Sequence, residues 1–156
     1  MIPQLLALRQ TRVERAQQTL AGARARHGAA ARARDDANHT LAAWTQEAAS
    51  RENAIHASIF HQIVTQRRMD EVRGVVAKLR ARTVALDQAR AAAQQAVDQA
   101  ADAVDTAKAA RAKAQREAEQ VQALNDVIVQ EHRGAQLRRE DEELDEVVCL
   151  TWRQPS

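Results

Sequence analysis

The chain has 156 residues, a formal net charge of +2 and 28% charged residues, with one Phe, two Trp and no Tyr. Alanine is the main apolar residue, with 35 copies, so large side chains are too few for a thick globular core. The regular apolar patterning argues against a disordered chain, and no apolar run approaches the roughly 20 residues that span a bilayer.

The N-terminal residues lack the charge-first order of a signal peptide. The single cysteine, Cys149, excludes an internal disulfide and fits a reducing compartment. We therefore expect a cytoplasmic protein with no direct membrane insertion.

Proline is confined to Pro3 and Pro155, so nothing between them must break a helix. An internal proline would cost a helix about 3 kcal/mol. Ala and Gln, the latter with 17 copies, both favour helix. The composition predicts one or two very long helices.

The first predicted arm covers about residues 4–72. A seven-residue apolar step runs through it, interrupted at His27 and Arg34, and includes Leu6, Val13, Leu20, Leu41, Ala48 and Ile55. A second column lies three residues further on, at Ala16, Ala23, Ala30, Ala37 and Trp44. Two columns at this spacing are typical of the inner stripe of a coiled coil.

A reversal is predicted near residues 70–78. No Gly-Pro or Asn-Gly turn marks it, and Gly74 is the best candidate because glycine adopts the left-handed conformation of helix ends. A turn there makes the numbers of facing residues add up to about 148. This register places Leu6 near Leu144, Val13 near Leu137, Leu20 near Ile128, and Trp44 over Val104 and Ala107.

The second predicted arm covers about residues 78–150 and carries the clearest pattern. Its first column, starting at Val72, is apolar at all nine positions: Val72, Leu79, Leu86, Ala93, Ala100, Ala107, Ala114, Val121 and Ile128. Its second column is Val76, Thr83, Arg90, Val97, Val104, Arg111, Ala118 and Asn125. The sequence thus predicts an all-α protein, a single long two-helix antiparallel coiled-coil hairpin over residues 1–156.

Charge is uneven along the chain. Residues 1–34 hold seven Arg and one acid, whereas six of the seven residues 140–146 are acidic. The predicted register sets Arg9, Arg12 and Arg15 beside residues 140–143. Such exposed pairs contribute about 0–1 kcal/mol each, but their signs favour antiparallel pairing.

An apolar cluster surrounds the predicted turn: Ile55, Ile59, Phe60, Ile63, Val64, Val72, Val75, Val76 and Leu79. One interpretation is a better-packed hairpin end. The other is a docking surface, because Phe60, Val64 and Val75 lie off the seam and exposed apolar residues at helical spacing suit a partner's groove.

The residue inventory argues against an enzyme. The sequence has no G-x-x-x-x-G-K, G-x-G-x-x-G or C-x-x-C motif, and no two histidines have the spacing of a helical metal site. We expect no catalytic residues, cofactor or metal. The acidic tail and scarce aromatics also argue against a nucleic-acid partner, for which salt-sensitive retention on DNA would be the test.

Two segments carry a resemblance to a known family. The opening residues 5–16 (LLALRQTRVERA), followed by an Ala/Arg/Gln-rich helix, and the closing residues 138–146 (RREDEELDE) resemble the YscO/FliJ stalk proteins of type III secretion systems. The resemblance implies a cytoplasmic stalk at the base of the secretion apparatus. It also implies three partners, the hexameric secretion ATPase, an export gate protein and export chaperones, and a fold similar to the coiled coil of the rotary ATPase gamma subunit.

Site residues follow from the resemblance as hypotheses. ATPase contacts are assigned to Arg9, Arg12, Arg15, Glu140, Glu142 and Glu143. Export-gate contacts are assigned to Ile59, Phe60, Ile63, Val64, Val75 and Leu79. The alternative function is a self-associating coiled-coil scaffold or adaptor, which sedimentation would distinguish by mass and length.

Overall fold

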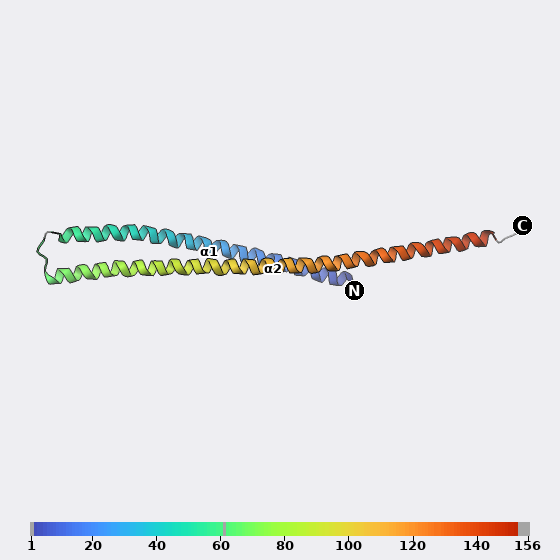
Figure 1. Ribbon diagram of the computed structural model, residues 1–156, viewed down its shortest axis with the longest axis horizontal. Helices are drawn as coiled ribbons and strands as arrows, with labels where there is room; N and C mark the ends of the chain where they lie inside the picture. The colour runs from blue at the N-terminus through green and yellow to red at the C-terminus, as the bar shows by residue number, and fades with distance from the viewer. Residues whose placement is uncertain (1, 61, 153–156) are drawn as a thin grey trace. The chain divides into compact units, whose positions relative to one another are not determined.

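The computed structural model describes residues 2–60 and 62–152, which form two helices joined by a short connection (Figure 1). Helix α1 is Ile2–Ile59, 58 residues long, and helix α2 is Gln66–Trp152, 87 residues long. The part of the chain described contains no strand. The predicted all-α fold, with two helices packed antiparallel as a hairpin, is confirmed.

The connection between the helices is held by local hydrogen bonds. At the end of α1, the Phe60 N–H donates to the His56 carbonyl at 3.1 Å. Thr65 is the N-cap of α2, because its hydroxyl accepts a hydrogen bond from the Arg68 N–H at 3.3 Å and its carbonyl accepts one from the Met69 N–H at 3.1 Å. These contacts end one helix and begin the next without a glycine.

The predicted turn at residues 70–78 is therefore wrong. Gly74 lies inside α2, and its backbone does not adopt a left-handed φ. Arm one ends at Ile59 instead of 72, and arm two begins at Gln66 instead of 78. Threonine at an N-cap satisfies the unpaired N–H groups of a helix start, so the reversal needs no glycine.

The predicted seam positions are confirmed. Every position listed for the predicted columns of the two arms is buried or half-buried, except Arg90 and Arg111. His27 and Arg34, which interrupt the apolar step, also lie half-buried in the seam. The long stems of arginine and the ring of histidine cover apolar surface while their polar ends reach water.

The chain divides into two compact units. The unit of residues 19–107, here called the loop unit, contains the connection, and the terminal unit comprises residues 1–18 and 108–156. In the loop unit α1 and α2 lie side by side (Figure 1). Its core cluster consists of Leu20, Ala23, Val104 and Ala107. All the residues described as buried in either unit belong to the loop unit.

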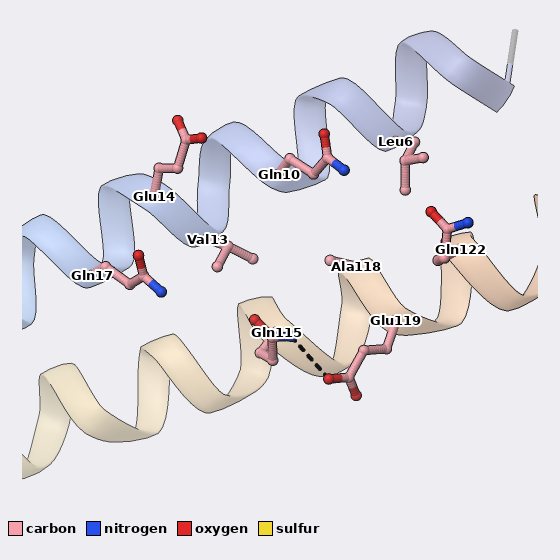
Figure 2. A pocket seen from close by; sticks show the side chains of 9 residues that line it. All are labelled: Leu6, Gln10, Val13, Glu14, Gln17, Gln115, Ala118, Glu119 and Gln122. Carbon is pink, nitrogen blue, oxygen red and sulfur yellow. Dashed lines mark hydrogen bonds between the residues drawn. The ribbon is translucent and has the colours of Figure 1, made fainter.

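The terminal unit is more thinly packed. Leu6 and Val13 of α1 face Ala118 of α2, and all three side chains are half-buried (Figure 2). Alanine is too short to seal the space between two helices. Folding therefore removes less apolar surface from water in this unit than in the loop unit. We expect the terminal unit to open more readily.

The predicted pairing register is also wrong. Arg9 pairs with Glu117 and Trp44 with Thr83, so the numbers of facing residues add up to about 126 instead of 148. Leu6 faces residues 118–122 and not Leu144, and Leu20 packs with Val104 and Ala107 and not Ile128. The remaining predicted neighbours change likewise. Val13 lies by Ala118 and not Leu137, and Trp44 by Thr83 and not Val104 or Ala107.

In this register the end of α2 extends past the start of α1. Helix α1 begins about one turn before Leu6, and Leu6 lies near Gln122. The pairing of α2 with α1 therefore ends about one turn after Gln122. We call residues 129–152 of α2 the overhang, which at 1.5 Å per residue is about 36 Å long. Every residue from 136 to 149 is exposed. None of the described helices has a stretch long and apolar enough to cross a membrane.

Candidate interaction surfaces

The basic residues near the start of α1 do not meet the acidic residues near the end of α2. Within the terminal unit, Arg9 is half-buried and forms an ion pair with Glu117. Glu140 follows Glu117 by 23 residues of continuous helix, which is about 35 Å. The predicted pairing of Arg9 with residues 140–143 is therefore replaced by the Arg9–Glu117 pair.

The guanidinium of Arg9 is only partly satisfied. Its side chain is 26% exposed and that of Glu117 is 32% exposed, while its Nε is buried without a hydrogen-bond partner. A buried N–H without an acceptor costs free energy, which offsets part of what the ion pair contributes. Arg12 and Arg15, in contrast, are exposed. They are the two cations of this group that a partner can reach.

A shallow groove of about 430 Å³ lies between the helices of the terminal unit (Figure 2). Leu6, Val13 and Ala118 form its apolar floor, and its polar lining is Gln10, Glu14, Gln17, Gln115, Glu119 and Gln122. The Gln115 side-chain amide donates to the Glu119 carboxylate at 2.9 Å. An apolar floor with an amide rim suits a third helix. The sequence analysis did not single out this groove.

The overhang is amphipathic. Leu137 and Leu144 are seven residues apart and therefore on one face, and they are 61% and 63% exposed. Glu142 and Glu146 lie two residues before and after Leu144, so they project from the opposite face. The predicted contacts Glu140, Glu142 and Glu143 all lie on this exposed segment.

The predicted gate-contact residues divide into exposed and buried groups. Phe60 is 70% exposed, Ile63 is fully exposed and Val75 is 45% exposed, whereas Ile59 and Val64 are half-buried. Leu79 is 7% exposed and belongs to the seam, so little of its side chain is accessible to a partner. Beside the connection, Ser58, Ile59, Gln62, Ile63, Val64, Thr65 and Arg68 line a hollow of about 220 Å³.

Metal-ligating side chains are not grouped. Among residues 2–60 and 62–152, no three His, Cys, Asp or Glu side chains come together in a way that would hold a metal ion. Cys149 is exposed on the overhang. The surfaces described are long helical faces and shallow grooves, which are suited to contacts with other proteins.

One of three comparisons with known proteins identified a family. The family model for the type III secretion protein YscO matches residues 2–149, nearly the whole chain. Neither the search of curated proteins nor that of solved structures gave a match. A match of this extent, on a chain that folds as two long antiparallel helices, shows that the protein belongs to the YscO family of type III secretion proteins.

Proposed function

We propose that this chain is a non-enzymatic stalk of a type III secretion apparatus. In this proposal it lies in the cytoplasm at the base of the apparatus, inserts into the hexameric secretion ATPase, couples that ring to the export gate and receives export chaperones. Membership of the YscO family is the observation that carries the proposal. The described surfaces, which are helical faces and shallow grooves, are consistent with a role in binding proteins.

The overhang is the part of the chain best suited to enter a ring. A single helix with its side chains is about 10–12 Å wide, whereas two packed helices add an interaxial distance of about 8–10 Å. A pore that is wide enough for one helix but too narrow for two therefore admits only the overhang. One asymmetric helix contacts six identical subunits unequally, so it favours different nucleotide states in different subunits.

Charge reversal on the overhang tests this assignment. Glu140→Lys, Glu142→Lys and Glu143→Lys change three exposed residues that have no α1 partner, so the fold should be retained. We expect stimulation of the purified secretion ATPase by the wild-type chain and a loss of at least about ten-fold in ATPase capture by the triple variant. The matched control reverses Asp70, Asp98 and Asp102, which gives the same change in net charge on the paired part of α2.

The outcomes test separately the coupling role and the location of the ATPase contact. Unchanged ATPase turnover with the wild-type chain would refute the coupling role. Stimulation that survives overhang reversal but is lost in the control would move the ATPase contact to the paired part of α2.

The connection is assigned to the export gate because Phe60 and Ile63 expose large apolar side chains there. Phe60→Ser with Ile63→Ser should abolish capture of the gate's cytoplasmic domain and leave ATPase capture unchanged. Val84→Ser, which alters a 56% exposed apolar residue elsewhere on α2, is the control. Retained gate capture by the double variant would remove this assignment.

A self-associating scaffold is the second candidate. The observation in its favour is the exposed Leu137–Leu144 stripe at seven-residue spacing, which is the spacing of a coiled-coil seam. Sedimentation decides between the two functions. A stalk should sediment as a 17.3 kDa monomer at micromolar concentration, and a scaffold should sediment as a dimer that Leu137→Ser with Leu144→Ser dissociates.

A further inference from the structure

A second groove, of about 520 Å³, lies in the loop unit and combines an indole ring with several cations. Its lining from α1 is Trp44, Glu47 and Arg51, and its lining from α2 is Val75, Lys78, Leu79 and Arg82. We call it the Trp44 groove. Val75 and Leu79 are also among the predicted gate contacts, but neither those contacts nor the family relationship accounts for the indole ring and the cations beside it.

The polar edge of Trp44 is already satisfied within the protein. Its indole N–H donates to the Thr83 hydroxyl at 3.0 Å, and that hydroxyl donates to the Leu79 carbonyl at 3.1 Å. These bonds hold the ring in one orientation across the seam. What the half-buried ring offers to a partner is therefore its π surface and its apolar edge.

Two guanidinium groups lie against this ring. The Cζ atom of Arg82 is 4.8 Å from the ring centroid, and that of Arg51 is 5.8 Å from it. Both distances are within the range of a cation–π interaction. A stacked guanidinium keeps its N–H groups in the plane of the fork, where they can bind a carboxylate with two hydrogen bonds.

The charges of the groove are not balanced. Arg51 forms an ion pair with Glu47, but among the described residues neither Arg82 nor Lys78 has a carboxylate within ion-pair distance. The lining therefore holds three cations and one anion. A ligand that enters this groove gains most if it brings negative charge.

The spacing of the cations indicates the shape of that ligand. Lys78 and Arg82 are four residues apart on α2, so they lie one turn apart on the same face. Val75, three residues before Lys78, adds an apolar surface that is 45% exposed. Two carboxylates one helical turn apart, with an apolar side chain beside them, match this pattern.

We infer that the Trp44 groove docks an acidic amphipathic helix of a partner protein. One carboxylate binds Arg82, a second binds Lys78, and the apolar side chain packs against Val75 and the Trp44 ring. Trp and Arg are the residues most enriched among those that dominate binding energy at protein interfaces. This inference does not depend on the ATPase or gate assignments.

A protein helix fits better than a nucleic-acid strand. Acids interrupt the basic surface in and around the groove, since Glu47 lies in its lining and Glu52 pairs with Arg80 at 3.6 Å. A phosphate backbone needs a continuous run of cations, and each carboxylate beside it repels the strand. A peptide can place its few carboxylates only where cations are.

The test uses the full chain with Trp152→Phe, so that Trp44 is the only tryptophan. The probe is a synthetic helical peptide with two Glu four residues apart flanking a Leu, and its control is the same peptide with Gln for Glu. Binding is followed by Trp44 emission and by anisotropy of the labelled peptide. We expect the Glu peptide to bind at least about ten-fold more tightly than its Gln counterpart, and less tightly as salt rises.

Variants then locate the site. Lys78→Gln with Arg82→Gln should weaken binding at least about ten-fold, and Lys78→Gln alone, which keeps the Arg82–Trp44 stack, several-fold. Arg67→Gln with Arg73→Gln removes two exposed cations elsewhere on α2 and should change affinity less than about two-fold. Circular dichroism of each variant checks that the helices are retained.

Four results would overturn the inference. The Gln peptide binds as tightly as the Glu peptide, or the Arg67/Arg73 control loses as much affinity as the groove variant. A single-stranded oligonucleotide or inorganic phosphate displaces the peptide at equal or lower concentration, which would make the groove a phosphate site. The chain alone forms a dimer that Lys78→Gln with Arg82→Gln dissociates, which would make the occupant a second copy.

Discussion

Leucine-to-alanine substitutions at two sites test how the stability of the protein is distributed. Leu20 is 4% exposed in the loop-unit core, and Leu137 is 61% exposed on the overhang. The chemical change and the change in helix propensity are the same at both sites. Any difference in effect therefore comes from packing.

The magnitudes follow from burial. Burying a leucine side chain almost completely is worth about 2 kcal/mol, and the cavity left by its removal adds to the loss. The neighbours of Leu20 include Ala23 and Ala107, whose methyl groups are too short to fill the space. We expect Leu20→Ala to lower the free energy of unfolding by about 3 kcal/mol. We expect Leu137→Ala to lower it by less than about 0.5 kcal/mol.

Urea unfolding followed by helical circular dichroism measures both values, with the wild-type m-value as the check that the unfolding transition keeps its character. An equal loss from both substitutions would refute the reasoning. A larger loss from Leu137→Ala would mean that the overhang is packed in solution and that the register described here does not hold.

Three further predictions concern the connection, the register and local stability. Thr65→Ala removes the N-cap of α2 and should cost about 1 kcal/mol in urea unfolding, with Thr65→Ser close to wild type; an unaffected Thr65→Ala variant would show that the cap contributes nothing. Spin labels at residues 6 and 122 should report close neighbours. Labels at 6 and 144 should be separated by about 33 Å, the length of helix between residues 122 and 144, and the opposite ranking would support the register in which facing residue numbers add up to 148. Hydrogen exchange should be fastest at residues 136–149 and slowest in the loop-unit core, and uniform protection would contradict the division into two units.

The interaction surfaces could be predicted only in part. The sequence analysis singled out the apolar cluster near the reversal and the acidic run 140–146, because apolar and charged runs stand out in an alanine-rich chain. It paired that acidic run with the start of the first arm, however, and did not predict the overhang. It missed the Trp44 groove, whose α1 and α2 residues are brought together only by the register. It also included Leu79 among the export-gate contacts, although its place in the seven-residue column indicates the seam, where it is 7% exposed.

The sequence alone determined the helical state and the inner face of each helix. Both depend on local quantities, namely helix propensity, the absence of proline between Pro3 and Pro155, and the spacing of apolar residues. Even His27 and Arg34 could be placed in the seam, because their neighbours one heptad away fix the face on which they lie.

Only the tertiary structure decided where the chain reverses and which residues face each other. The predicted and observed registers differ by about 22 residues, close to three heptads, and a slide of this kind keeps much the same small side chains in contact along the seam. Repetition thus makes the alternatives nearly equal in packing energy. The register is therefore decided by a few contacts that do not recur along the helices. These are the Thr65 cap, the Trp44–Thr83 hydrogen bond and the Leu20 cluster, and the last two form only when both helices are in place.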